Sequence, residues 1–348
     1  MLGVIHQQWP DLKHKHSLVV KHKDDPVEVV DDESFNKLFS KLGSTNVELS
    51  VDTKCLGFSD YASNRNLVEE LLDCKIRDNV EFPSDETIPM EKYQEEVHVV
   101  CAELLRRLKF LDLHQASENT MRELISPVLI GALSLVESQN TDSSGMVKLI
   151  CEKQISGSSG NGPVDYVLSY KSVYIVIGEA KKGDLDAGFY QNLMQQWSAL
   201  ESLADKTLPF KLSGNKRKLL FGEKFNTLKA KLGTFGITST GSHWIFSRVE
   251  NAPEGSAHST IVRQSRLYSL HDDIGAESRS FGQRVETLLR IIVQMIHTQK
   301  ETISSRCPDL ISEDTQSHLK LANEEEIARK HSDENKDDVD DEEDDKSA

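Results

Sequence analysis

The stretch GPVDYVLSYKSVYIVIGEAKKGD, residues 162–184, contains two runs of strand-forming residues separated by a short polar turn. The second run is apolar at both odd and even positions over residues 173–178, which is typical of a central strand buried on both faces. This second run is followed by two charged residues, Glu179 and Lys181, which lie on the same face of the strand. The stretch therefore predicts a strand pair inside a sheet, with ionisable side chains where it emerges.

The first strand of this pair carries an acid close to Glu179. If the turn is centred on Ser172, Asp165 lies directly opposite Glu179, with the two side chains about 5 Å apart. Two carboxylates at that distance raise each other's pKa, which is usually tolerated only for a shared proton, a basic partner or a bound cation. Mg²⁺ needs only one or two protein carboxylates, so Asp165 and Glu179 could hold it.

This spacing suits phosphodiester hydrolysis. A bound divalent cation acidifies a water and polarises a phosphoryl oxygen, and Lys181 could orient the attacking water or neutralise charge in the transition state. The alternative is that Asp165 simply begins one strand while Glu179 and Lys181 form an ion pair where the next strand meets solvent. The spacing alone does not separate these two interpretations.

The rest of the chain predicts helices and strands in a defined order. Helices are predicted over 91–114, 118–137, 184–203 and 281–299, and strands over 147–154, 164–169, 173–180, 234–240 and 243–249. The order is helix, helix, three strands, helix, strands, helix, which predicts an α/β or α+β fold.

The segment that contains these acids resembles the motif of a known family. GPVDYVL, followed by IGEAKK, resembles the motif of the PD-(D/E)XK nuclease superfamily. Pro163 and Asp165 stand for the first half of the motif, with Val164 inserted between them, and residues 179–181 match the second half. The resemblance covers about residues 93–298 and implies the restriction-endonuclease-like form of the α/β class, in which helices flank a mixed central β-sheet.

The resemblance also implies a metal site. Asp165 and Glu179, with the backbone of Ala180, would hold Mg²⁺ or Mn²⁺. Lys181 would handle the nucleophile.

Two further positions follow from the resemblance alone. Many members carry an acid on the helix before the first core strand. Glu118 is favoured over Glu123 because the TMRELISPVL after it looks like the segment that follows that acid in related nuclease domains. Gln191 matches a glutamine that recurs on the helix after the motif, with Gln195 one turn later as the alternative.

The resemblance leaves the N-terminal part of the chain unexplained. SDETIP, residues 84–89, reads as a linker. Three regions are therefore expected: residues 1–90 of unknown role, a nuclease-like domain over 91–300, and a polar linker with an acidic tail over 301–348. Residues 333–346 carry ten acids and two lysines, which is half of the net charge of −16, and are expected to be disordered.

Positive charge gathers in NKRKLLFGEKFNTLKAKL, residues 215–232, with six basic residues and one acid. Lys216, Arg217 and Lys218, with Lys182 beside the motif, are the expected phosphate contacts. A solvated loop and helix face is the alternative. The expected partner is nucleic acid, with DNA favoured over RNA, and NKRK could also serve as a minimal nuclear-import signal.

The remaining composition indicates the compartment. Five cysteines, far apart and without ligand spacing, predict neither a disulfide framework nor a zinc site. The first thirty residues lack a continuous apolar run and no stretch approaches eighteen apolar residues, so neither a signal peptide nor a membrane span is expected. An intracellular protein, nuclear or cytoplasmic and without a membrane partner, is the expectation.

The sequence is compatible with two classes of function. The first is a metal-dependent endonuclease acting on DNA or RNA. The second is a catalytically inactive nuclease-fold module that acts by binding protein or nucleic acid. This second class includes effectors of the Crinkler type, in which nuclease-like domains follow an unrelated N-terminal region. That group's N-terminal motifs have no clear match here. A purely structural α/β protein would leave the charges at the strand exit unexplained.

Overall fold

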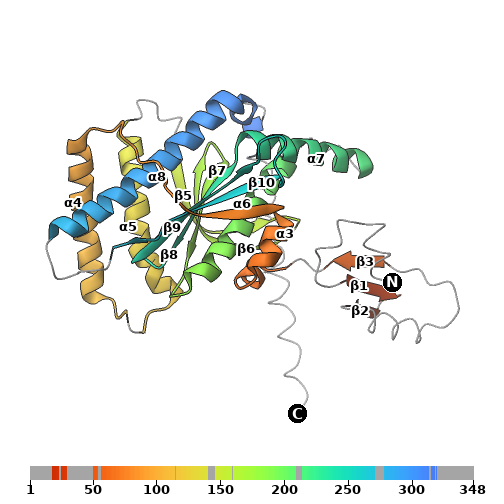
Figure 1. The fold of residues 1–348 in the computed structure, drawn as a ribbon, viewed down its shortest axis with the longest axis horizontal. Helices are drawn as coiled ribbons and strands as arrows, with labels where there is room; N and C mark the ends of the chain where they lie inside the picture. The colour runs from red at the N-terminus through yellow and green to blue at the C-terminus, as the bar shows by residue number, and fades with distance from the viewer. Residues whose placement is uncertain are drawn as a thin grey trace, which may run out of the picture.

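A computed structural model gives the architecture (Figure 1). It describes residues 18–22, 25–29, 50–53, 56–113, 115–139, 146–158, 160–208, 214–270, 278–312, 315–317 and 319. The acidic tail expected over 333–346 lies outside these residues. A three-stranded antiparallel sheet near the N-terminus consists of β1 (Leu18–His22), β2 (Asp25–Val29) and β3 (Ser50–Thr53).

An eight-stranded mixed sheet forms the centre of the fold. Its strands are β4 (Cys74–Val80), β5 (Val147–Ser156), β6 (Asn161–Tyr170), β7 (Val173–Ala180), β8 (Thr234–Ser239), β9 (His243–Asn251), β10 (Thr260–Ser265) and β11 (Tyr268–Ser269). They lie in the order β4-β10-β9-β8-β7-β6-β5, with β11 beside β9. The pairs β7–β8 and β10–β4 are parallel and the others antiparallel. The predicted mixed central sheet flanked by helices is confirmed.

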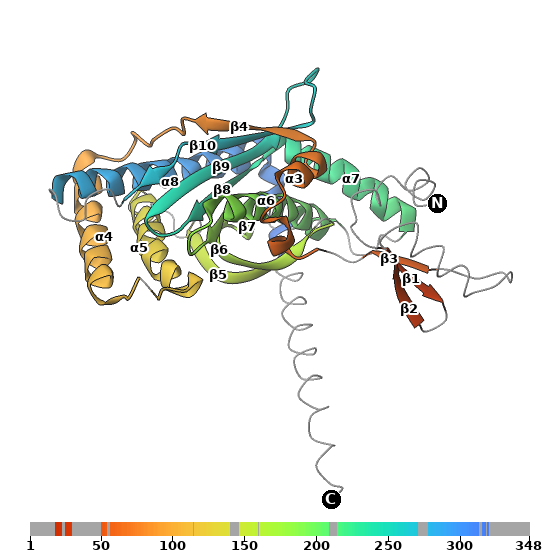
Figure 2. The ribbon, with the colours of Figure 1, turned by 60° about the horizontal axis from the view of Figure 1, so that its bottom comes forward.

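Helices cover both faces of this sheet (Figure 2). They are η2 (Phe58–Tyr61), α3 (Arg65–Leu71), α4 (Met90–Phe110), α5 (Glu118–Glu137), α6 (Leu185–Lys206), α7 (Gly214–Lys231), α8 (Ser278–Arg306) and η4 (Pro308–Ile311). On one face, Phe189 of α6 packs in a cluster with Val167 and Ile177, while α4, α5 and α8 pack on the other face. Among the residues that the structure describes, no helix has both the length and the apolar character needed to cross a membrane.

The turn between β6 and β7 sets the register of the acids. Lys171 and Ser172 form a two-residue turn, and their φ angles of 47° and 63° fit a hairpin turn of the mirror-image type. If that turn alone set the pairing, Asp165 would lie opposite Gly178, one residue before Glu179. A register shift further along the strands removes the offset. Beyond it the pairs are Leu168–Val176, Val167–Ile177 and Tyr166–Gly178. The predicted register at the acids is therefore reached through a shorter turn and a bulge.

The body of the fold begins earlier than the boundary predicted at residue 90. Strand β4 is an edge strand of the large sheet, paired in parallel with β10. Asp85, within the predicted linker over 84–89, is fully buried. Its carboxylate accepts hydrogen bonds from the Tyr93 hydroxyl at 2.9 Å and from the Ile88 amide at 3.1 Å. This segment is therefore part of the packed body rather than a linker, and α8 likewise continues past residue 300.

Candidate active site

Asp165 and Glu179 lie side by side on the adjacent strands β6 and β7. Their exposed fractions are 7% and 4%. The amide of Ala180 donates a hydrogen bond to Asp165 Oδ2 at 2.7 Å, which holds the Asp165 carboxylate against the end of β7. Because the N–H and C=O of a strand residue point to the same side, the Ala180 carbonyl also faces Asp165. Three oxygen-bearing groups therefore share one small region at the exit of the strands.

Lys181 joins this region to helix α5. Its Nζ lies 2.8 Å from Glu179 Oε1 and 3.4 Å from Glu118 Oε1. The first turn of α6 leaves room for this lysine because residue 188 is glycine: a Cβ there would lie 2.5 Å from Lys181 Cγ. The structure thus brings together Glu118, Asp165, Glu179 and Lys181, as the sequence predicted.

Helix α6 supports Glu179 through a glutamine. Gln195 Nε2 donates to Glu179 Oε2 at 2.7 Å, and Asn192 Nδ2 donates to Gln195 Oε1 at 3.3 Å. Gln191 is buried on the same helix one turn earlier. Gln195, the alternative one turn later, therefore makes the supporting contact to Glu179, and Gln191 stays a predicted site residue.

A close approach between α6 and β8 keeps this helix in place. Gln196 Nε2 donates to Asn192 Oδ1 at 2.9 Å and to Ser247 Oγ at 2.8 Å, so the amides form a buried chain across the sheet. This row of hydrogen-bonded amides passes over Gly236, where a Cβ would lie 2.1 Å from Asn192 Oδ1. Glycine at this position allows the amide chain that orients Gln195 to lie directly on the sheet.

Arg122 is a site residue that the motif did not reveal. From α5 it forms an ion pair with Asp165 Oδ1, and its second terminal nitrogen lies 2.5 Å from Glu152 Oε1. Glu152 has a φ of 53° and sits in β5 between residues paired with those flanking Asp165. The helical spacing offered a signal, because Arg122 follows Glu118 by four residues and therefore lies on the same face of α5.

The pKa values reflect how crowded the acids are. Burial raises the pKa of Asp165, and burial together with the nearby Asp165 raises the pKa of Glu179 to about 7. Burial lowers the pKa of Lys181, but Glu179 and Glu118 outweigh it and hold that pKa above its ordinary value. Ionisation of the two carboxylates is thus unfavourable, while the neighbouring lysine stays protonated. This arrangement favours uptake of a proton or a cation by the carboxylates.

This protonation gives a pH dependence that can be measured. A cation held by Glu179 would compete with a proton, so its affinity would rise about tenfold per pH unit below pH 7 and level off above it. Titrations at pH 5.5, 6.5, 7.5 and 8.5 would measure this slope. In the absence of metal the sign for stability is opposite: the folded state takes up a proton between the ordinary pKa and about 7, so stability falls as pH rises through that window. A Mg²⁺ affinity that is flat from pH 5.5 to 8.5 would contradict a role for Glu179 as a ligand of the cation.

The donor set suits a hard divalent cation. Within the described part of the chain, no three side chains of histidine, cysteine, aspartate or glutamate come together as a complete metal cage. Mg²⁺ does not require one, since it binds through one or two carboxylates and keeps several waters. Thr238, on β8 opposite Glu179, has a buried hydroxyl without a hydrogen-bond partner among the described residues and could bind such a water. The oxygens of Asp165, Glu179 and Ala180 therefore fit Mg²⁺ or Mn²⁺.

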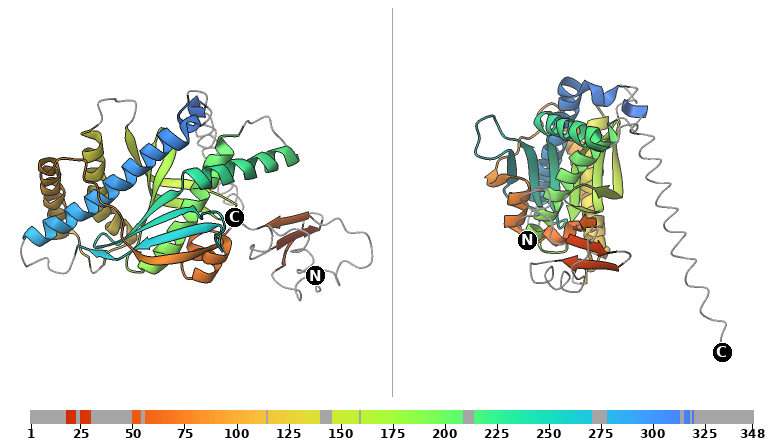
Figure 3. Two further views of the ribbon diagram at one scale, coloured as in Figure 1. Left: turned by 45° about the horizontal axis from the view of Figure 1, so that its top comes forward. Right: turned by 90° about the vertical axis from the view of Figure 1, so that its right-hand side faces the viewer.

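The expected phosphate contacts divide into two groups. Lys182 is exposed and directly follows the lysine of the site. Lys216 and Lys218 are exposed on α7, which projects from the body (Figure 3), whereas the side chain of Arg217 lies outside the described set. Helix α7 leads into the start of β8, and β8 is parallel to β7, so this start lies at the end of the sheet opposite Glu179. Lys216 and Lys218, expected as phosphate contacts, therefore lie on a helix that meets the sheet at the end away from the acids.

Comparison with models of known protein families found no match for the chain, and a search of curated proteins found no similar sequence.

Proposed function

We propose that the chain is a metal-dependent nuclease of the restriction-endonuclease-like type, hydrolysing phosphodiester bonds of DNA or RNA. The observation that supports this most is the placement of Asp165 and Glu179, two buried carboxylates from adjacent strands, with Lys181 held on Glu179 at 2.8 Å. The order α5, β5, β6, β7, α6, β8 is also the helix, three strands, helix, strand order of that family's core.

Asp165, Glu179 and the Ala180 carbonyl would hold the cation, which when bound supplies an acidified water and stabilises charge on the phosphoryl oxygens. The chain's own groups then position the reactants. Gln195 fixes one oxygen of Glu179, leaving the other toward Lys181. The Lys181 ammonium can donate hydrogen bonds to the attacking water or to a phosphate oxygen, because its three protons exceed its two carboxylate partners.

Glu118 and Lys182 complete the proposed mechanism. The Glu118 side chain is 48% exposed while contacting Lys181, so it can accept a proton from the attacking water and release it to solvent. Lys182 is exposed beside the site and can contact a neighbouring phosphate of the same strand. Substrate binding is therefore expected to weaken as salt is raised.

The direct test is cleavage of plasmid DNA, of single-stranded DNA and of RNA by the purified full chain in Mg²⁺, Mn²⁺ or EDTA. Lys181→Ala is compared with Lys75→Ala, an exposed lysine on the far edge strand β4. Cleavage that needs the metal, persists in Lys75→Ala and is lost in Lys181→Ala would support the proposal. Cleavage of neither polymer, or equal cleavage by the Lys181→Ala variant, would overturn it.

One observation favours a second candidate, a nuclease-fold module that binds without catalysis. Arg122 contacts Asp165 and Lys181 contacts Glu179, so each of the two acids has a basic partner without any metal. Such pairing would let the two acids persist in a protein that never binds Mg²⁺. The two candidates differ in whether Arg122 can be displaced.

Replacing Arg122 with methionine tests this point. If a cation competes with Arg122 for Asp165, the Arg122→Met variant is expected to bind Mg²⁺ about tenfold more tightly and to melt at a lower temperature in EDTA, because the two acids then repel each other. Thermal melts in EDTA and in Mg²⁺ measure both effects, with the exposed Arg106→Met on α4 as control. Unchanged or weaker Mg²⁺ binding in Arg122→Met would favour the binding module.

A further inference from the structure

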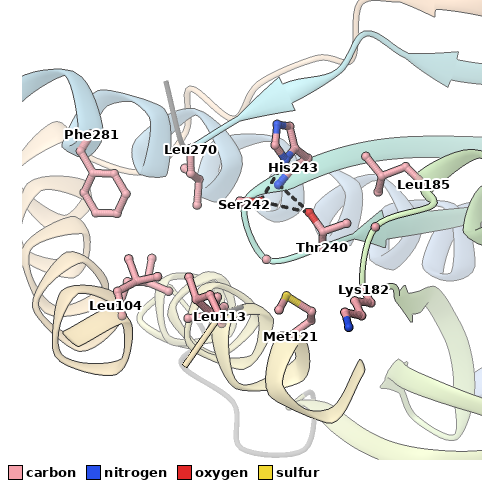
Figure 4. Close-up of a pocket in the computed structure, with 14 residues that line it drawn as sticks. Leu104, Leu113, Met121, Lys182, Leu185, Thr240, Ser242, His243, Leu270 and Phe281 are labelled. Atoms are coloured by element: carbon pink, nitrogen blue, oxygen red, sulfur yellow. Dashed lines mark hydrogen bonds between the residues drawn. The ribbon is translucent and has the colours of Figure 1, made fainter. Parts of the chain in front are cut away.

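A cavity of about 380 Å³ lies beside the candidate active site, between α4, α5, the start of α8 and the turn from β8 to β9 (Figure 4). One side of it is apolar, formed by Leu104, Leu108, Met121, Leu124, Leu270 and Phe281. The other side is polar, formed by Lys182, Thr240 and Ser242. Its volume is within the range of about 300–1,000 Å³ that is usual for sites of small organic groups.

The cavity and the acids share two walls. Helix α5 presents Glu118 and Arg122 to the acids, and it presents Met121 to the cavity. The segment after β7 also borders both regions, since Lys181 contacts Glu179 while the next residue, Lys182, lines the cavity. A ligand seated in the cavity would therefore lie next to a group bound at the acids.

The turn that forms the polar wall is held in place by its neighbours. Gly241 has a φ of 78°, and a Cβ at that position would lie 2.7 Å from Leu124 Cβ, so the turn packs closely on α5. The Ser242 hydroxyl lies 3.2 Å from Thr240 Oγ1 and 2.9 Å from His243 Nδ1. The hydroxyls are therefore positioned before any ligand arrives.

We propose that this cavity binds one unstacked nucleobase of the substrate strand, next to the phosphate that is attacked; this inference rests on the proposed function. The apolar side, with the Phe281 ring, suits the face of a base, and the hydroxyls of Thr240 and Ser242 suit its hydrogen-bonding edge. Lys182 lines the cavity and directly follows Lys181, which contacts Glu179, so it could bind a phosphate beside that base. A base enters only when it is unpaired, so single strands or flipped nucleotides are the inferred substrates rather than intact duplex.

The test measures binding of the full chain in EDTA, where no cleavage occurs, by fluorescence anisotropy. The probes are labelled single-stranded DNA and RNA oligonucleotides, the matching duplexes, and single strands of equal length whose central positions are all abasic. Leu108→Trp fills the cavity from α4, and Leu105→Trp, at a 48% exposed position on the same helix that does not line the cavity, is the matched control. Ser242→Ala and Phe281→Ala remove one hydroxyl and one ring without adding bulk.

The expected result is that Leu108→Trp raises the Kd for the normal single strand about tenfold while Leu105→Trp leaves it unchanged. Abasic positions should weaken binding to the wild type by a similar factor and leave Leu108→Trp unaffected. Equal affinity of the wild type for normal and abasic strands, or no binding of any probe, would overturn the inference. If Leu108→Trp does not fold, unchanged affinity in both Ser242→Ala and Phe281→Ala overturns it.

Cleavage measured separately in Mg²⁺ distinguishes the two proposals. Base-dependent binding without any cleavage would leave the cavity assignment standing and remove the nuclease. Cleavage together with base-independent binding would support the nuclease and overturn the cavity assignment.

Discussion

Replacing Glu179 with glutamine is expected to lower the rate of phosphodiester cleavage by about a thousandfold or more. The change removes one of the two carboxylate charges that would hold the cation, and it removes the anion that positions Lys181 at 2.8 Å. The amide keeps the volume of the side chain and can still accept from Gln195 through its oxygen. The loss should therefore appear in cleavage with little change in melting temperature, measured on the same preparation.

A matched control makes this result specific. Glu250→Gln removes an acid of the same sheet that forms ion pairs with Arg248 and Arg263 on β9 and β10. Its cleavage rate should stay within about twofold of the wild type, because these groups are outside the proposed site. Comparable losses in both variants would mean that the effect comes from the sheet as a whole and not from the proposed metal ligands.

Replacing Asp85 with alanine is expected to have the largest effect on stability, a loss of about 3–5 kcal/mol in the free energy of unfolding at pH 7. The fully buried carboxylate accepts from Thr87 Oγ1 at 2.7 Å and from the Tyr93 hydroxyl at 2.9 Å, and it lies 3.2 Å from His297 Nδ1. Truncation leaves these partners without an acceptor in the interior. Urea denaturation at pH 7 measures the loss, and the neighbouring exposed Glu86→Ala should change stability by no more than about 0.5 kcal/mol.

The pH dependence of this effect follows from the sign of the shift. Burial would raise the pKa of Asp85, but hydrogen bonds from Thr87, Ile88 and Tyr93 outweigh it and hold that pKa below its ordinary value. The stabilisation is therefore present above the ordinary pKa of about 3.9 and is lost as pH falls through the lower folded value. The difference between wild type and Asp85→Ala should shrink as pH falls through that range. A difference that stays constant down to pH 2 would show that the charge of Asp85 contributes nothing.

Local sequence patterns predicted the centre of the fold well. Helix α5 begins at Glu118 and ends at Glu137 as its apolar spacing predicted, and β7 spans the predicted 173–180. The grouping of Glu118, Glu179 and Lys181 followed from strand alternation and from the family resemblance. These features depend on residues close in sequence, or on one hairpin, so that periodicity and turn chemistry suffice to predict them.

Features that depend on distant contacts were missed. Strand β4 pairs with β10 across almost two hundred residues, which no local pattern records. The basic segment, for which a solvated loop and helix face was the alternative, is helix α7. In its last turn Lys229 is buried, with its Nζ 5.0 Å from the centre of the Trp197 ring. The choice between Gln191 and Gln195 depended on how α6 is rotated on the sheet, which packing over Gly236 decides.

The central claim is that Asp165 and Glu179 hold a divalent cation. Electron paramagnetic resonance of free Mn²⁺, recorded during titration of the wild type and of Asp165→Asn at pH 8, counts bound ions directly. The account predicts that the wild type removes Mn²⁺ from solution, that Mg²⁺ displaces it, and that Asp165→Asn binds at least about tenfold more weakly. Wild type that leaves the free Mn²⁺ signal unchanged, with and without single-stranded nucleic acid, would contradict it.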